Sequence, residues 1–220
     1  MKAKRYTVLM MVAVLAWLVC SCGQTDEDYR YPSVLTDYVC LATGAAGKVE
    51  RMLLDNGASY PVSFADTYEK VPSFKADTLY RVVGGYELNA AEQEVEAVIY
   101  SVGSVVSAVP VPLRKGEQMH QEPVYLQSIW LSGGYLNMVL EVKALNGKHS
   151  IGFVDTTPEG MQGKEFAFYH KVVDDVEAYR QKLYGSIPLG SFEENLQQGD
   201  TLRFVVNTYD DGLCSYEYVM

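Results

Sequence analysis

The side chains best suited to chemistry in this 220-residue sequence are its three histidines. Zinc binding or metalloprotease chemistry would require them at a defined spacing, such as HExxH, or beside cysteines. No such spacing occurs, so we expect His149 and His170 to be half-buried imidazoles that hydrogen-bond to backbone groups. A metal site shared by these two is a minor alternative, and His120 suggests no role.

Two glycine patterns come close to catalytic loops without matching them. The segment Gly44–Val49 is two residues short of a phosphate loop, and valine stands where a Mg²⁺-binding hydroxyl is needed. The segment Gly57–Pro61 lacks the final glycine of a nucleophile elbow. We interpret both segments as turns.

Adjacent acidic residues occur at 174–175, 193–194 and 210–211. Neighbours on a strand point to opposite faces, so these pairs do not form a general acid and base. We expect solvated loops, with incidental Ca²⁺ binding at 210–212 as a lesser alternative. The chain therefore predicts a protein that is not an enzyme, with no catalytic residue, metal or cofactor.

The N-terminus carries an export signal. Lys2, Lys4 and Arg5 precede an apolar run from Val8 to Val19. As a helix that run is roughly 18 Å long, too short for a hydrocarbon core of ~30 Å. The pattern indicates a secretory signal rather than a membrane span.

The tetrapeptide Val19-Cys20-Ser21-Cys22 resembles a bacterial lipobox. Lipidation needs a thiol at the cleavage site, and the small Ser21 favours Cys22 over Cys20, which follows the bulky Val19. We predict a signal peptide over 1–21 and lipid on Cys22, with palmitate among its acyl chains. A plain signal peptide is the alternative. Two or three acyl chains anchor a protein stably to a membrane.

Cleavage before Cys22 leaves 15 basic and 28 acidic residues, a net charge of −13. This balance argues against nucleic acid as a partner, because phosphate neutralisation needs clustered lysine and arginine. Residues 22–35 form an acidic tether, which is equally consistent with a surface-export signal of Bacteroidetes. We expect an outer-membrane lipoprotein and leave open whether it faces the cell surface or the periplasm.

Beyond Tyr38 the hydrophobic period is two, which indicates β-strands. Alternation is clearest over Tyr135–Val142. The following Asn146-Gly147 favours a type I′ turn, and a hairpin there would pair Val142 with Ile151 and Leu140 with Phe153. That register places His149 opposite Ala144.

Further strands are expected over 49–54, 79–88, 95–106, 166–172 and 202–208. The first runs into a turn at Asp55-Asn56-Gly57, and Gly84-Gly85 predicts a bulge. A short helix is expected over Asp174–Leu183, with Asp174 as its N-cap. Three prolines between 110 and 123 mark a linker. We place domains at 36–112 and 124–220, joined by residues 113–123.

Two cysteines and the tyrosines complete the candidate groups. We expect Cys40 and Cys214 to be separately buried, with a disulfide as the alternative that an oxidising envelope allows. The 17 tyrosines suit half-buried pleated surfaces, and an aromatic binding platform is a second interpretation.

The second half of the chain resembles the NigD-like lipoproteins of Bacteroidetes. The resemblance rests on Trp130, Gly133–Asn137, His149, Tyr169-His170, Asp175, Ser186–Leu189, Gly199-Asp200 and Asn207-Thr208. Leu54–Gly57 and Gly84–Tyr86 match in the first half, and Lys171 departs from an expected Asn. The resemblance implies an OB-like barrel followed by a β-sandwich. It brings no catalytic residues.

These observations predict an all-β, non-enzymatic lipoprotein that binds a ligand or a partner through its β surfaces. The partner could be a glycan or an envelope protein, and Trp130, Tyr135 and Asn137 are candidate ligand contacts. Their alternative roles are structural. A structural or immunity-type envelope protein of a bacteriocin-like locus is the second hypothesis, and a hydrolase is the third.

Overall fold

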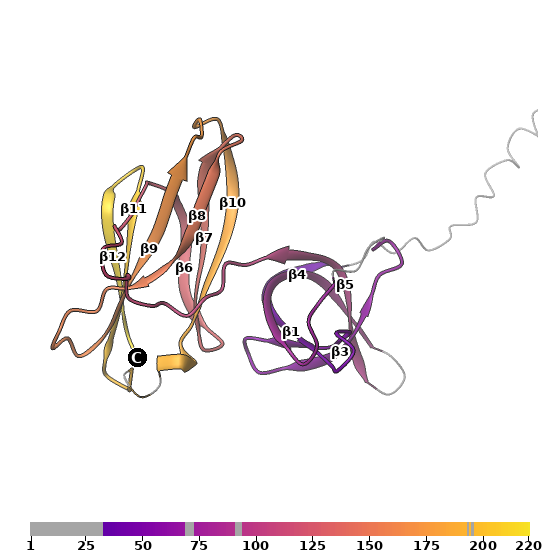
Figure 1. Ribbon diagram of the computed structural model, residues 1–220. Coiled ribbons are helices and arrows are strands. Elements are labelled where there is room, and N and C mark those ends of the chain that lie inside the picture. Colours follow the sequence, from indigo (N-terminus) through magenta and orange to yellow (C-terminus); the bar gives the residue numbers. More distant parts are fainter. Residues whose placement is uncertain (1–32, 69–72, 91–93, 193, 195) are drawn as a thin grey trace, which may run out of the picture. The chain divides into compact units, whose positions relative to one another are not determined.

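The alternating pattern produces twelve β-strands in the computed structural model (Figure 1). The structure describes residues 33–68, 73–90, 94–192, 194 and 196–220. Across these ranges the chain is all-β, with a single 3₁₀ turn, η1 (Gly190–Phe192). None of the described helical structure is long and apolar enough to cross a membrane.

Five strands close into a barrel in the order β1-β2-β3-β5-β4. Their bounds are β1 Leu35–Thr43, β2 Val49–Leu54, β3 Ser59–Phe64, β4 Leu79–Ala90 and β5 Val95–Ser104. Strands β3 and β5 run parallel, and the other pairs are antiparallel. Inward residues such as Leu41, Met52 and Ile99 are almost fully buried and form the barrel core. The expected all-β fold with a closed small barrel is confirmed.

The irregularity predicted at Gly84-Gly85 lies beside that pair, but the extra residue belongs to the partner strand. Gly85 pairs with Ser101 and Tyr86 with Ile99, so Tyr100 of β5 is the bulged residue, opposite a single step of β4. The turn at Asp55–Gly57 also forms, because the amide of Gly57 donates to the carbonyl of Leu54 and Gly57 adopts a φ of 87°. Both features shape the barrel at or beside positions that the sequence had marked.

The other seven strands form two facing sheets. One sheet has the order β10-β7-β6 and the other β12-β11-β9-β8. The strands are β6 Tyr125–Ser132, β7 Tyr135–Ala144, β8 Lys148–Asp155, β9 Gly163–Val173, β10 Tyr179–Pro188, β11 Thr201–Thr208 and β12 Gly212–Val219. Leu136, Met138 and Leu140 of β7 join Phe166 and Phe204 of the other sheet in one buried core.

The hairpin predicted at Asn146-Gly147 is wrong. Strand β7 pairs with β6 and β10, whereas β8 pairs with β9, so the turn carries the chain from one sheet to the other. Gly147 is not among the residues with positive φ, which a type I′ turn requires. His149 accordingly lies opposite Val172 and not Ala144. Two strands that pack on one core from facing sheets show the same alternation of apolar and polar residues as the two strands of a hairpin.

The helix predicted over Asp174–Leu183 is also wrong. Residues from Tyr179 onward belong to β10, which pairs with the whole length of β7, from Ala144 to Tyr135. Asp174 adopts a φ of 52° instead of capping a helix. The backbone ladder to a central strand outweighs the helix propensity of this polar segment.

Residues 105–124, here named the strap, connect the barrel to the sandwich along the sheet edges. Val106 bridges Gly185 of β10, and Val111 bridges Val154 of β8. Further on, Gln121 bridges His170 of β9 and Val124 bridges Thr208 of β11. The segment expected to act as a linker is therefore tied to four strands by main-chain contacts, although its prolines keep it extended.

Candidate functional site

Arg81 of β4 is the organising residue of the candidate site. It stands in an otherwise apolar stretch of the strand, and its side chain is 3% exposed. Because guanidinium carries five N–H donors in a fixed fork, its burial requires five acceptors. The tertiary structure supplies them from both the barrel and the sandwich.

Asp55, in the turn after β2, accepts from both terminal nitrogens of Arg81, at 2.5 Å for Nη1 to Oδ1 and 2.8 Å for Nη2 to Oδ2. Nη1 also donates to Cys40 Sγ at 3.6 Å. From the sandwich, Asn137 Oδ1 accepts from Nη2 at 3.0 Å and Ser186 Oγ accepts from Nε at 3.3 Å. All five donors are therefore used, and the residues form one network across the two domains.

Charge and aromatic rings reinforce this network. Burial lowers the pKa of Arg81, but hydrogen bonds to Asp55 and Cys40 raise it by more, so the residue stays a cation. The guanidinium carbon lies 4.1 Å from the ring centroid of Tyr135 and 5.4 Å from that of Tyr38. Burial and the contact with Cys40 raise the pKa of Tyr135 to about 12. Hydrogen bonds to an ion in a low-dielectric site are stronger than in water.

A second contact between barrel and sandwich lies beside Arg81. The hydroxyl of Tyr38, on β1, donates to the carbonyl of Met138 on β7 at 2.6 Å. The same ring meets Trp130 of β6 edge-on, with centroids 5.4 Å apart. Burial raises the pKa of Tyr38, so it remains a neutral donor. The aromatic contact and the Arg81 network together position the pocket that follows.

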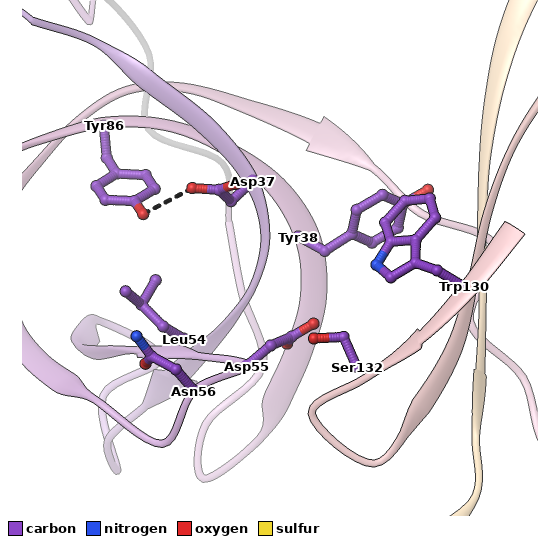
Figure 2. Close-up of a pocket in the computed structure, with 8 residues that line it drawn as sticks. All are labelled: Asp37, Tyr38, Leu54, Asp55, Asn56, Tyr86, Trp130 and Ser132. Carbon is purple, nitrogen blue, oxygen red and sulfur yellow. Dashed lines mark hydrogen bonds between the residues drawn. The ribbon is translucent and has the colours of Figure 1, made fainter. Parts of the chain in front are cut away.

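A pocket of about 290 Å³ opens beside this network (Figure 2). Figure 2 shows barrel side chains from β1, β2, β4 and the turn after β2, together with two sandwich side chains from β6. The lining residues are Asp37, Tyr38, Leu54, Asp55, Asn56, Tyr86, Trp130 and Ser132. The pocket thus combines an indole with carboxylate, amide and hydroxyl groups.

The two carboxylates of the pocket already have protein partners. Asp55 binds Arg81 through both oxygens, and Asp37 Oδ2 accepts from the hydroxyl of Tyr86 at 2.9 Å. Asp37 is an exposed residue that lines the pocket. A carboxylate held bidentately by arginine is a poor general base, because its lone pairs and charge are occupied.

The structure separates the three residues that the sequence proposed as ligand contacts. Trp130 lines the pocket. Asn137 is fully buried behind it, where it accepts from Arg81 and from Ser186 Oγ at 2.7 Å. Tyr135 covers Arg81 with its ring. Cys22, the predicted lipid site, lies outside the described residues.

Sequence reasoning missed Arg81 and the pairing role of Asp55. The available signal was a single arginine inside the apolar run Leu79–Leu88, where an unpaired charge would be costly. Its partners come from segments up to 105 residues away, so no local pattern shows them.

The histidines come together although their predicted register was wrong. His149 Nδ1 lies 2.8 Å from His170 Nε2, and His149 Nε2 lies 2.7 Å from Asp175 Oδ2. His170 Nδ1 lies 2.9 Å from the carbonyl oxygen of Glu122, which agrees with the expected backbone contact. No group of three or more ligand side chains in the described part of the chain is arranged to hold a metal ion.

The remaining candidate groups have structural surroundings. Cys40 and Cys214 are both free thiols, the first buried and the second half-buried. Tyr125 and Tyr209 stack at 4.7 Å, but Arg180 lies over Tyr125 at 3.8 Å and Lys143 over Tyr209 at 4.2 Å. The cations occupy ring faces that an aromatic platform would offer to a ligand.

A closed five-stranded barrel, an Arg81 junction and a seven-stranded sandwich define a class of two-domain all-β proteins. The family model of the NigD-like C-terminal beta sandwich domain matches residues 107–220, slightly more than half of the chain. The chain belongs to the NigD-like family.

Solved structures extend the match to the barrel. A NigD-like immunity protein from Bacteroides caccae is 31% identical, with a TM-score of 0.70, and the match covers 87% of this chain and 99% of that one. A protein of unknown function from Bacteroides vulgatus is 14% identical over 84% of this chain and 91% of its own, with a TM-score of 0.63, and shows the fold alone. No curated protein matches the chain.

Proposed function

We propose that this chain is a lipid-anchored, non-enzymatic envelope protein that binds a ligand in the pocket between barrel and sandwich. The observation that carries the proposal is the pocket itself, which combines Trp130 with hydrogen-bonding groups beside a fully satisfied buried arginine. Preformed concave sites with an aromatic wall and a few polar groups at a domain junction are typical of small-ligand binding.

The lining chemistry favours a hydroxyl-rich ligand such as a glycan. The carboxylate of Asp37, the amide of Asn56 and the hydroxyl of Ser132 can accept from or donate to sugar hydroxyls. The indole of Trp130 can cover an apolar ring face. Since about 290 Å³ is near the lower limit for ligand pockets, a single small group would enter it.

Binding of labelled glycans to the full mature chain tests this role. We expect Trp130→Ala to weaken binding at least tenfold, because it removes the aromatic wall. Tyr179→Ala is the matched control, since this tyrosine is 69% exposed and does not line the pocket. Equal binding by the Trp130 variant and the wild type would exclude the pocket as the ligand site.

A second candidate function rests on the relative that is 31% identical, which is described as an immunity protein. Such a protein would act by docking to another envelope protein. A photocrosslinking amino acid at position 130 would then give a discrete protein adduct in intact cells, and the same group at position 179 would not. Identical crosslinks from both positions would count against docking at the pocket.

The hydrolase hypothesis has the least support. Asp55 is held by Arg81, and the thiol nearest to the pocket, Cys40, is buried against Arg81 and Tyr135. Ser132 also lines the described pocket, but its hydroxyl makes no hydrogen bond to the carboxylate of Asp37 or of Asp55. We infer a binding role without turnover.

The anchor is proposed from the sequence at Cys22. Mass spectrometry of the N-terminal peptide should find Cys22 acylated, and Cys22→Ala should move the protein out of the membrane fraction. A free thiol at Cys22 would refute lipidation. Protease treatment of intact cells, with a lysed control, then distinguishes a surface-exposed protein from one that faces the periplasm.

A further inference from the structure

Asp175, His149, His170 and the backbone of Glu122 form a continuous hydrogen-bonded chain inside the sandwich. The three contacts measure 2.7, 2.8 and 2.9 Å in that order. The side chains of His149 and Asp175 are 11% and 2% exposed, and His170 is 2% exposed. Water therefore contributes little to the hydrogen bonding of these nitrogens. Which ring nitrogens carry protons can be deduced from their protein partners.

Each contact in the chain requires a proton on a ring nitrogen. The carbonyl oxygen of Glu122 only accepts, so His170 Nδ1 must carry a proton. The carboxylate of Asp175 also accepts, so His149 Nε2 must carry one. The contact between His149 Nδ1 and His170 Nε2 needs a third, because two bare lone pairs would repel at 2.8 Å. Two neutral imidazoles supply only two protons.

We infer that His149 and His170 together hold one proton beyond their neutral complement, and that this proton locks three loops of the sandwich together. The resulting positive charge is balanced by Asp175. Loss of the proton would leave one of the three contacts without a hydrogen, and the segments that those contacts join would separate. The pair is thus a pH-sensitive switch, independent of the pocket beside Arg81.

The charge resides on His149. Burial and the neighbouring His149 lower the pKa of His170, so His170 is the neutral ring that accepts at Nε2. The hydrogen bond from His149 is the main cause that lowers the pKa of Asp175, whose carboxylate then faces the cation. The alternative, with the shared proton on His170 Nε2, would satisfy the same three contacts, but it would place the cation on the more buried ring and away from Asp175.

The groups that surround the pair favour the proton. A cavity of about 150 Å³ beside His170 is lined by Glu122, Lys143, Glu177 and Tyr209. Lys143 is neutralised by Glu177 at 3.0 Å, and Tyr209 donates to Glu177.

Three further charged or titratable groups belong to this neighbourhood. The Glu122 carboxylate lies 3.6 Å from His120, and its buried Oε2 has no hydrogen-bond partner. On the other side, Lys182 lines a separate pocket with His149. The negative charges of Asp175 and Glu122 therefore outweigh the positive charge of Lys182 near the pair.

The lock acts on three segments. Asp175 Oδ1 accepts from the amides of Leu145 and Asn146, in the connection between β7 and β8, at 3.1 and 3.0 Å. It also accepts from the amide of Val176 at 2.8 Å. Glu122 belongs to the strap, where its amide donates to the carbonyl of His170. The shared proton thus joins the connection at 145–147, the segment before β10 and the strap.

Ring-nitrogen NMR of the ¹⁵N-labelled full mature chain tests the proton count. At pH 7 we expect both nitrogens of His149 to be protonated and His170 to be the neutral Nδ1–H tautomer. Raising the pH until the extra proton leaves should reduce the exchange protection of the Leu145, Asn146 and Val176 amides at least tenfold, after correction for intrinsic exchange.

One variant that perturbs the pair and one control variant complete the test. Asp175→Asn removes the balancing charge at nearly constant shape, so His149 should lose its second proton at lower pH than in the wild type. Asp174→Asn makes the same chemical change at an exposed residue outside the chain of contacts and should leave both observations unchanged. Only two ring-nitrogen protons on the His149–His170 pair at pH 7, or protection that does not change from pH 6 to pH 10, would overturn the inference.

Discussion

At the scale of single residues, two charged side chains, Arg81 and Asp175, hydrogen-bond to several segments of the chain at once. Arg81 places five donors on acceptors from both domains, and Asp175 accepts from three amides and one imidazole. Apart from Val176, which directly follows Asp175, the partners come from segments that are distant in sequence. A buried ion that is fully hydrogen-bonded fixes geometry, because removing one partner leaves the others unsatisfied.

Asp175 gives the protein an acid-sensitive contribution to stability. Its pKa is lowered in the fold, mainly by His149, so this contribution is complete above the ordinary aspartate value of 3.8 and is lost as the pH falls below it. Melting temperatures from pH 6 to pH 2.5 should fall more steeply for the wild type than for Asp175→Asn. The exposed neighbour Asp174, changed to Asn, should behave like the wild type.

At the scale of elements, the turn between β6 and β7 touches the turn after β2. A Cβ on Gly133 would lie 2.6 Å from the carboxyl carbon of Asp55, whereas one on Gly134 would meet nothing within 4 Å. Both glycines have positive φ, 60° and 79°. The two positions therefore share backbone strain and differ in contact with the Arg81 network.

This difference supplies a matched pair of variants. Gly134→Ala should cost about 1–2 kcal/mol of unfolding free energy from backbone strain. Gly133→Ala should cost more, because its methyl group displaces Asp55 from Arg81. Urea denaturation of both variants measures the difference, and equal losses would mean that the contact between the turns contributes nothing.

The strap offers a second comparison, between two valines that it contributes. Val124 is fully buried in the sandwich core, and Val111 is 63% exposed. Val124→Ala should lower the unfolding free energy by about 2 kcal/mol, since it leaves a cavity. Val111→Ala should stay within about 0.5 kcal/mol of the wild type. Similar values for both would show that the strap is not anchored through the core.

The strands were easier to predict than their partners. Alternation over Tyr135–Val142 located β7, but it could not distinguish a hairpin with β8 from strands in facing sheets, because both bury the same face. The polar segment from Asp174 onward has helix-forming composition, and pairing with β7 overrides it. Turn glycines such as Gly57 were predictable because positive φ is a local requirement.

The candidate site was less predictable than the fold, for a physical reason. Trp130 was identified from its type, but Arg81 and Asp55 meet only after the barrel closes and docks on β7 and β10. Asn137 was a candidate ligand contact with a structural hydrogen-bonding role as its alternative, and its full burial supports the structural role. Its burial among Arg81 and Ser186 depends on tertiary contacts that no local pattern records.

At the scale of the whole molecule, the Arg81 network couples the two domains. Residues Val34–Met220 form one compact unit. Within it, Arg81 donates to both carboxylate oxygens of Asp55. Trp130 beside it is the single tryptophan downstream of Cys22, so its fluorescence reports on the junction. Circular dichroism reports on all strands.

Arg81→Met should therefore separate two signals that coincide in the wild type. We expect tryptophan fluorescence to change at lower urea than circular dichroism, because Asp55 is left unpaired and the junction between the domains is weakened. Arg51→Met, at an exposed arginine that bonds Ser59, should leave the two curves superimposed. Coincident curves for the Arg81 variant would show that the domains unfold together without this network.

The strap has a consequence for self-association. Strands β10 and β8 end their respective sheets, and unpaired N–H and C=O groups at a sheet end form a template for another chain. Val106 donates to Tyr184 and accepts from Ser186, and Val111 accepts from Asp155, so the strap covers part of each of these two ends. A sandwich excised after residue 112 would lose these contacts and present more of β10 and β8 to intermolecular β-pairing. The strap therefore restricts edge-to-edge association of the sandwich at these two strands.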